Sequence, residues 1–242
     1  IEQEDVLTGE GMVEEIDAVT PYLNHVCALF PDIGDGMNIV IDSGNGVAGP
    51  VYKEAACIVG ASVTGLFIVP DGTFPNHAAD PSKYDTLKDL QASVKETASD
   101  MGLAFDGDGD RLGLVDENGV IRTADEILLL LARDHLERNP GRAVVFTVSN
   151  SGALESEITA WGGRPVMTTV GHSFVEHAMR DNNALLGGEQ SGHFFCSEGY
   201  FGFDDALVSA LRIMQIVKVS GRTLSELCSD FPTVYQMPEN RP

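Results

Sequence analysis

The sequence predicts an α/β fold of two consecutive three-layer α/β/α domains, each with a mostly parallel mixed sheet. Short apolar runs typical of strands alternate with longer amphipathic segments typical of helices, which is the pattern of βαβ units. Polar, glycine-containing loops follow several of these runs, as at the carboxyl ends of strands in open sheets. A capped helix start at Thr123 opens a second series of the same alternation. The length of 242 residues allows two modest domains.

The first predicted domain covers residues 1–120. Aliphatic runs bounded by glycine and proline indicate its strands, and apolar residues recurring every three or four positions indicate its helices. The stretch 70–85 is rich in turn-forming residues and predicts a loop. In chain order we expect a helix at 4–29, a strand at 38–41, a helix at 47–59, a strand at 62–69, a helix at 86–99, and strands at 103–105 and 112–115.

The second predicted domain covers residues 121–230. Thr123 with Glu126, and Ser173 with Glu176, have the spacing of capping boxes, which predicts two helix starts. Residues 231–242 contain three prolines and predict a linker toward a further domain. In chain order we expect a helix from Thr123 to the turn at 139–141, a strand at 143–148, a helix at 153–161, a strand at 165–170, a helix ending at 179, strands at 184–186 and 194–196, a helix at 204–219 and a short helix ending at 230.

Composition excludes several classes of function. The formal net charge of −22 and the pI near 4.4 disfavour a nucleic-acid or anionic-membrane partner. No run of 18 apolar residues and no basic-then-apolar leader occurs, so neither a membrane span nor a signal peptide is predicted. The four cysteines are scattered, which favours buried free thiols in a reducing, cytoplasmic setting. Because the chain opens at Ile1 in acidic, helix-like sequence, we expect it to be part of a longer protein.

The loop Asp106-Gly-Asp-Gly-Asp-Arg111 is the most informative motif of the chain. Asp106, Asp108 and Asp110 lie at alternate positions, and the intervening glycines let them turn toward one hard cation. Three clustered carboxylates repel one another unless a cation neutralises them. Oxygen-only ligands favour magnesium, calcium or manganese. Two alternatives remain: an acidic turn without metal, and a calcium EF-hand loop ending at Glu117. The EF-hand is disfavoured because Arg111 occupies the position where that loop requires glycine.

Residues 44–49, Gly-Asn-Gly-Val-Ala-Gly, spell a dinucleotide-binding fingerprint. They follow a predicted strand and open a predicted helix, and Asp71 ends the next strand about 20 residues on. Two residues intervene before the first glycine, however, and Pro50 follows the last. The motif therefore indicates either a structural strand-to-helix turn or a nucleotide site of an oxidoreductase.

Two further polar loops carry candidate site residues. His172 follows Gly171 at a predicted helix start, where a histidine can bind an anion or act as an acid or base. Glu189, Ser191 and His193 lie on a glycine-framed loop and suit a ligand rich in hydroxyl groups. The alternatives are a surface histidine and an ordinary polar turn. Because these loops and the acidic loop all follow strands, we expect them to share one cleft between the domains.

Five stretches together resemble the α-D-phosphohexomutases, the phosphomannomutase/phosphoglucomutase superfamily. They occur in the family's order across about 150 residues. The stretches are Val40-Ile41-Asp42-Ser43-Gly44-Asn45-Gly46, Asp71-Gly72-Thr73-Phe74-Pro75-Asn76-His77, the loop 106–111, Val170-Gly171-His172-Ser173 and Gly188-Glu189-Gln190-Ser191-Gly192-His193.

The resemblance implies a role for each motif. Enzymes of this superfamily have four domains round a cleft, and residues 1–120 and 121–230 resemble the second and third. Asp106, Asp108 and Asp110 would hold Mg²⁺, with Arg111 a cationic contact beside the phosphoryl group. Glu189 and Ser191 would bind sugar hydroxyls, while Gly171, His172 and His193 would line the cleft. The reaction would move a phosphoryl group between O1 and O6 of a phosphohexose.

Parts of the family pattern are missing. The first domain's phosphoserine loop, Ser-His-Asn-Pro, does not occur in the sequence, and neither does the basic phosphate-binding fourth domain. We therefore expect this chain alone to be inactive and its partners to be domains I and IV of the same polypeptide. Two lysines typical of phosphomannomutase-like members are replaced, near Ser149 and Thr169. These replacements leave open a non-catalytic relative that binds sugar phosphates, and other signals are mixed, so the hexose is undecided.

Overall fold

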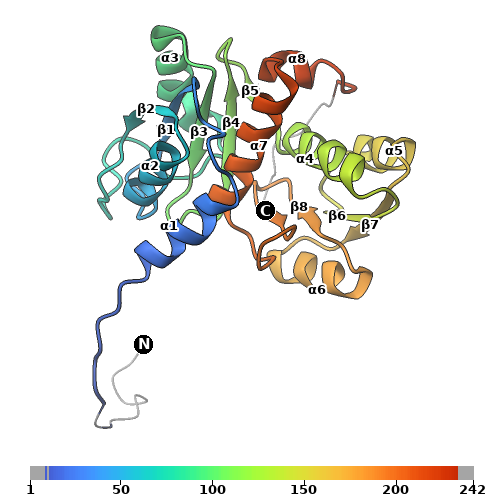
Figure 1. Cartoon of the computed structure of the whole chain (residues 1–242), viewed down its shortest axis with the longest axis horizontal. Helices are drawn as coiled ribbons and strands as arrows, with labels where there is room; N and C mark the ends of the chain where they lie inside the picture. Colours follow the sequence, from blue (N-terminus) through green and yellow to red (C-terminus); the bar gives the residue numbers. More distant parts are fainter. Residues whose placement is uncertain (1–8, 10, 234–242) are drawn as a thin grey trace.

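The computed structural model describes residue 9 and residues 11–233, which form two α/β domains side by side (Figure 1). The first domain contains, in chain order, α1 (Val19–Ala28), β1 (Asn38–Asp42), α2 (Gly49–Ile58), β2 (Ser62–Leu66), the 3₁₀ helix η2 (Tyr84–Leu87), α3 (Lys88–Thr97), β3 (Met101–Phe105), β4 (Leu112–Asp116) and β5 (Ile121–Arg122). The second contains α4 (Ala124–Arg138), β6 (Ala143–Thr147), α5 (Gly152–Ala160), β7 (Arg164–Thr168), α6 (His172–Asn182), β8 (Leu186–Gly188), β9 (Phe194–Cys196), α7 (Ala206–Ser220) and α8 (Leu224–Cys228).

Both sheets are mixed, as the sequence predicts. The strand order is β2-β1-β3-β4-β5 in the first sheet and β7-β6-β8-β9 in the second. The first three strands of each order run parallel, and every later strand is added antiparallel. The parallel part comes from helical crossovers, and the antiparallel part from hairpins that need only a short loop. In each domain the antiparallel hairpin carries one of the predicted polar loops.

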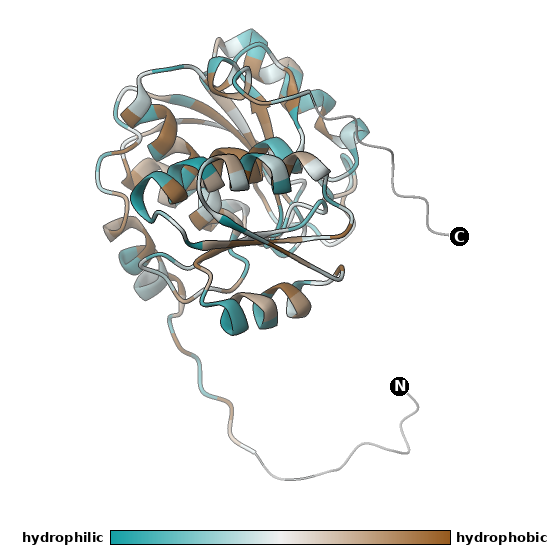
Figure 2. Ribbon diagram, turned by 90° about the vertical axis from the view of Figure 1, so that its right-hand side faces the viewer, coloured by the Kyte–Doolittle hydropathy of each residue, from teal (hydrophilic) through white to brown (hydrophobic). Residues whose placement is uncertain are grey.

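Each sheet is covered by helices on both faces, which completes the three layers. On β1, Ile39 and Ile41 face α1 and α2, whereas Val40 faces α3 on the other side. On β6, Val144 and Val145 divide in the same way, with α6 covering the face of Val145. Successive residues point to opposite faces of the sheet because side chains of a strand repeat every two residues. Figure 2 shows hydrophobic residues along the strands and hydrophilic residues on outward helix faces.

One hydrophobic core continues from the first domain into the second. It joins residues of α1, α2 and β3 to residues of α4, β6 and α7. Figure 1 shows α7 lying between the two sheets, where it contacts β4 of one and β9 of the other. Asp205 strengthens this junction because it caps α7 through the Val208 N–H and accepts from the hydroxyls of Tyr22 and Tyr200. The two domains are therefore packed as one unit.

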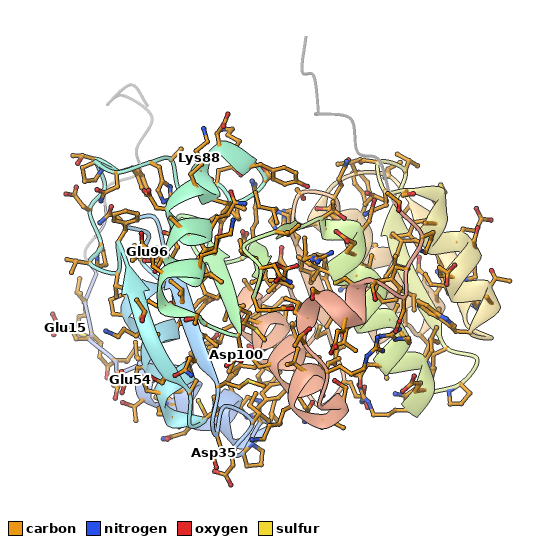
Figure 3. All side chains as sticks on the ribbon, turned by 90° about the horizontal axis from the view of Figure 1, so that it is seen from above. Glu15, Asp35, Glu54, Lys88, Glu96 and Asp100 are labelled. Atoms are coloured by element: carbon orange, nitrogen blue, oxygen red, sulfur yellow. The ribbon has the colours of Figure 1, made fainter. Side chains whose placement is uncertain are left out.

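Many acidic side chains of the first domain lie on the surface. Asp35, Glu54, Glu96 and Asp100 are exposed, and Figure 3 labels these four side chains on the first domain. Water solvates carboxylates in such exposed positions, so they do not each require a cationic partner. Within residues 9 and 11–233, no helix is both long and apolar enough to cross a membrane.

Several predicted boundaries are wrong in informative ways. The sequence predicts the first helix at 4–29, but helix α1 begins at Val19. Residues 11–18 are not helical, and residues 1–8 lie outside the described part of the chain. The strand expected to reach 69 ends at Leu66, because Phe67 takes a left-handed conformation that breaks the extended chain. The helix expected at 86–99 starts as η2 and ends at Thr97.

One of the two predicted capping boxes forms. Thr123 accepts from the Glu126 N–H while the Glu126 carboxylate accepts from the Thr123 N–H, as expected. The box expected at Ser173 and Glu176 is wrong, since α6 begins at His172 with Gly171 as its N-cap. Gly171 has φ +132° and ψ +130°, a conformation open to glycine, and so the helix starts two residues earlier than a Ser173 cap allows.

The cysteines are all free, but they are not all buried. Cys27, Cys196 and Cys228 are buried, whereas Cys57 is exposed on α2. In the segment predicted as a linker, Phe231 is largely buried and its ring lies 6.0 Å from that of Trp161. The start of this segment is thus attached to the second domain, and residues 234–242 lie outside the described residues.

Candidate functional site

The acidic loop connects β3 to β4 at the carboxyl end of the parallel strands. Asp106 Oδ1 accepts hydrogen bonds from the N–H groups of Gly109, Asp110 and Arg111, at 3.0, 3.0 and 3.1 Å. These bonds curl the loop round one carboxylate. Carboxylate oxygens of Asp106, Asp108 and Asp110 then lie within 4.8 Å of one another. The loop therefore brings the three predicted metal ligands together.

The charges of this loop favour a cation. Asp106 is buried, Asp110 is half-buried and Asp108 is exposed, which gives a cation access from one side. Burial raises the pKa of Asp106, the Arg111 N–H opposes that rise, and the neighbouring carboxylates of Asp110 and Asp108 add to it, to about 7. Asp110 Oδ1 is buried without a hydrogen-bond partner. An all-oxygen donor set with an unsatisfied oxygen fits Mg²⁺ or a similar hard cation.

The structure excludes the EF-hand alternative. The loop is flanked by β3 and β4, which pair antiparallel, whereas an EF-hand loop lies between helices. Glu117, the carboxylate that would close such a loop, is at the far end of β4. It accepts from the N–H and hydroxyl of Ser225 at the start of α8.

The second polar loop joins β8 to β9, and the third lies at the start of α6. Glu189 is buried, and its Oε1 accepts from the Gly171 N–H at 2.6 Å, so these two loops touch directly. Ser191 Oγ lies 3.5 Å from Glu189 Oε2. His172 is exposed and its ring centroid is 6.2 Å from that of His193. One carboxylate, one hydroxyl and two imidazole side chains thus lie close together.

Arg111 and His193 connect the acidic loop 106–111 to the second domain. Their backbones form an isolated β-bridge, and the Leu112 N–H donates to the Gly192 carbonyl at 3.0 Å. Arg111 Nε donates to His193 Nε2 at 3.0 Å. The predicted catalytic and binding residues of 106–111, 171–172 and 189–193 therefore lie together at the junction of the two domains, as the sequence-based hypothesis of a shared site requires.

Sequence reasoning missed two carboxylates that belong to this junction. Asp80 Oδ1 lies 3.7 Å from Arg111 Nη1, and Asp204 Oδ2 lies 2.8 Å from His193 Nδ1. Burial opposes ionisation of Asp204, but the contact with His193 outweighs burial and lowers the pKa of Asp204. For His193, burial opposes the charged form, yet Asp204 and Asp110 raise its pKa. The signal that could have found Asp204 is its place in Gly202-Phe203-Asp204-Asp205, at the first residue of a predicted helix.

A hollow of about 400 Å³ lies elsewhere, between α6 and the segment that leads into α7. Its walls include Met179, Arg180, Phe201 and Phe203, and the predicted site residues do not line it. The residues gathered by the three loops, not this hollow, form the candidate site.

The Gly44–Gly49 turn has little capacity to bind a pyrophosphate. Its N–H groups already donate within the protein, from Gly44 to Asp42, from Asn45 to the Phe67 carbonyl, from Gly46 to the Ser43 carbonyl and from Val47 to the Gly107 carbonyl. A dinucleotide site needs such N–H groups free to point at phosphate. The turn instead supports the metal loop, in line with the structural alternative.

Gly46 offers a direct test of this structural role. A Cβ at this position would lie 2.7 Å from the Asp106 carbonyl oxygen and 2.9 Å from that of Gly107. We expect Gly46→Val to destabilise the chain by about 1–3 kcal/mol, because backbone atoms of the metal loop must move. Denaturant unfolding measures the change. Gly72→Ala is the control, since a Cβ there meets nothing within 4 Å; an NAD affinity that is lost in Gly46→Val would support the nucleotide site instead.

Family models match both domains. Residues 20–119 match phosphoglucomutase/phosphomannomutase, alpha/beta/alpha domain II, and residues 123–235 match alpha/beta/alpha domain III of the same family. The chain belongs to this family.

Individual relatives agree with the family assignment. A phosphomannomutase/phosphoglucomutase from Pseudomonas aeruginosa is 43% identical over 241 residues, covering 99% of this chain and 51% of the relative. A solved phosphoglucomutase/phosphomannomutase family protein from Burkholderia thailandensis is 36% identical with a TM-score of 0.89, over 94% of this chain and 49% of that one. The chain thus spans about half the length of these family members.

A more distant structure shares the fold. The N-acetylphosphoglucosamine mutase of Aspergillus fumigatus, solved in complex with GlcNAc-6P and magnesium, is 21% identical with a TM-score of 0.65, over 87% of this chain and 49% of that one.

Proposed function

We propose that this chain forms the metal-binding and sugar-binding side of a phosphohexomutase that interconverts hexose 1-phosphates and hexose 6-phosphates. The observation that carries the proposal is the junction of Arg111 with His193, which joins the acidic loop of one domain to the sugar-type loop of the other. A mutase must place a hydroxyl-rich ring and a phosphoryl group at the same point. The names of the relatives support this reaction class.

Asp106, Asp108 and Asp110 would hold Mg²⁺, which supplies Lewis-acid neutralisation of phosphoryl charge. The Aspergillus relative, solved with magnesium, supports this choice of metal. Arg111 presents N–H donors beside the loop, and a guanidinium can bind two phosphoryl oxygens at once. The hydrogen bonds to Asp106 Oδ1 fix that carboxylate and the backbone of the loop, which reduces the rearrangement needed when a cation binds.

The sugar side of the proposed site uses neutral and acidic groups. Glu189 and Ser191 would accept from and donate to ring hydroxyls, and His172 and His193 would line the same surface. Gly171 lets α6 begin close to Glu189, because its N–H donates to that carboxylate. The phosphoryl donor, a phosphoserine by resemblance, is expected from a segment outside residues 1–242, as is a basic phosphate-binding domain.

The decisive experiment compares this chain with the polypeptide encoded by its complete gene. Both are assayed with mannose, glucose and glucosamine 1-phosphates, with and without Mg²⁺. We expect Mg²⁺ binding by both and turnover only by the complete polypeptide, which Asp108→Asn should abolish. Turnover by residues 1–242 alone would contradict the proposal that the phosphoryl donor and the phosphate-binding domain come from other segments of the polypeptide.

A non-catalytic sugar-phosphate-binding relative is the second candidate. It is favoured by Ser149 and Thr169, exposed residues near the carboxyl ends of β6 and β7 where phosphomannomutase-like members usually carry lysine. The same experiment separates the two: if the complete polypeptide binds a hexose phosphate in calorimetry but converts none of the three, the binding role is correct.

A further inference from the structure

A fourth segment, residues 197–205 between β9 and α7, reaches the site formed by the three predicted loops. Asp204 on this segment lies 2.8 Å from His193 Nδ1, and its carboxylate is within 4.8 Å of side-chain atoms of Asp110, His172 and Glu176. His193 is 7% exposed, so the contact is shielded from water. Asp204 is therefore placed to act on the site through His193.

The hydrogen bond from Arg111 determines where the proton of neutral His193 lies. A guanidinium has donors only, so His193 Nε2 must be the acceptor of the 3.0 Å contact with Arg111 Nε. The neutral imidazole then carries its proton on Nδ1. This nitrogen lies 2.8 Å from Asp204 Oδ2, an atom that can only accept while the carboxylate is ionised.

The same reasoning rejects a second metal site at this position. Asp110, His193 and Asp204 form a cluster with metal-ligand spacing, and one buried atom of each has no aligned hydrogen bond. A cation on His193 Nδ1, however, would need an imidazole with both nitrogens deprotonated, because Arg111 occupies Nε2. Such a contact between a histidine and a carboxylate can tighten when a substrate binds.

His193 in turn controls the position of Arg111. The Arg111 Nε atom is 3.5 Å from Asp106 Oδ2 and 4.0 Å from Asp110 Oδ1, so two metal-site carboxylates compete for it. While Nε donates to His193, the guanidinium is held to the side of the metal loop. Without an acceptor at Nε2, the arginine is free to shorten its 3.5 Å contact with Asp106 and to compete with a cation for that carboxylate.

We propose that Asp204 is a positioning residue that fixes the Nδ1–H tautomer of His193 and thereby holds Arg111 beside the metal loop. The proposal rests on the proposed function for its catalytic meaning, but its geometry is independent of turnover. Partners that orient a metal-ligating histidine change metal affinity by about 10–100-fold when they are removed. Here the effect reaches the acidic loop through Arg111, so we expect a loss at the lower end of that range.

The test reads the tautomer directly in the full chain, in mildly alkaline buffer without substrate. Nitrogen NMR of wild type should show His193 protonated at Nδ1, with a coupling through the hydrogen bond between Arg111 Nε and His193 Nε2. Asp204→Ala should mix the two tautomers, weaken this coupling and lower Mg²⁺ affinity about 10-fold. Asp204→Asn should retain the tautomer, because its amide oxygen still accepts from Nδ1.

Asp205→Asn is the matched control. It disturbs the same segment and weakens the contacts to Tyr22 and Tyr200, yet it should leave the His193 tautomer unchanged. A wild-type His193 protonated at Nε2, or a tautomer that Asp204→Ala does not alter, overturns the proposal. If Asp204→Ala does not fold, the wild-type coupling and Asp204→Asn still decide it. Because these signals need neither Mg²⁺ nor turnover, they separate this proposal from failure of the proposed function.

Discussion

Replacing Asp106 with asparagine is expected to lower the affinity of the chain for Mg²⁺ by at least about 100-fold, more than is usual for an outer partner of a metal site. Asp106 orders the loop through three N–H groups, and in the proposed metal site its other oxygen would bind the cation. Asparagine can keep the first role with its amide oxygen but presents an uncharged NH₂ group in the second. Isothermal titration calorimetry with Mg²⁺ measures the change. Glu96→Gln on the exposed face of α3 is the charge-matched control (Figure 3) and should bind as wild type does.

The Mg²⁺ affinity should also depend on pH. Without metal the pKa of Asp106 is about 7, well above its usual range, because the carboxyl is buried and lies beside other carboxylates. A raised carboxyl pKa means that the proton stabilises the fold below the unfolded pKa of about 3.9, and that this stability is lost as pH rises through about 7. In the proposed site, Mg²⁺ would take the place of the proton on Asp106 and neutralise the carboxylate charge.

We therefore expect the thermal stabilisation by Mg²⁺ to grow as pH increases through about 7. Scanning calorimetry with and without Mg²⁺ checks it. Asp106→Asn should remove the pH dependence of the difference; a difference that stays constant across that range in wild type would contradict the assignment of Asp106 as the titrating ligand.

Asp116→Ala is expected to destabilise the chain by about 3–5 kcal/mol, the usual cost of breaking a buried ion pair from one side. Asp116 is 0% exposed and accepts from Nε and Nη2 of Arg122 and from the N–H groups of Asn118 and Val120. Its loss leaves a largely buried guanidinium whose remaining charged partner among residues 9 and 11–233 is Glu126. Urea denaturation measures the free energy of unfolding.

The control for Asp116 is Asp85→Asn, which removes the exposed pair with Lys88 on the same domain. Because water solvates both partners of that pair, its removal should leave the free energy of unfolding nearly unchanged. Equal losses in the two variants would show that burial is not what makes the Asp116 pair important.

The sequence was most informative where local chemistry dictates structure. The Thr123 cap, the strands that end at polar loops, and the acidic loop follow from patterns contained within a few residues. Prediction from sequence failed where contacts between residues far apart in the chain determine a helix boundary or a side-chain partner. The start of α6 depends on Gly171 donating to Glu189 from another loop, so a plausible cap at Ser173 was not used. Asp204 escaped notice because its partner His193 is set by tertiary packing and not by sequence spacing.

The shared core round α7 has a mechanical consequence. Leu211 and its neighbours on this helix are buried in a single cluster with residues of both sheets, so a hinge between the two domains would open apolar surface to water. The acidic loop 106–111 and the Glu189 loop are joined directly by the Arg111–His193 bridge, so the shared core also fixes their relative position. If one hexose phosphate must present either of its two ends to the metal, we expect the sugar to turn and the two domains to keep their arrangement.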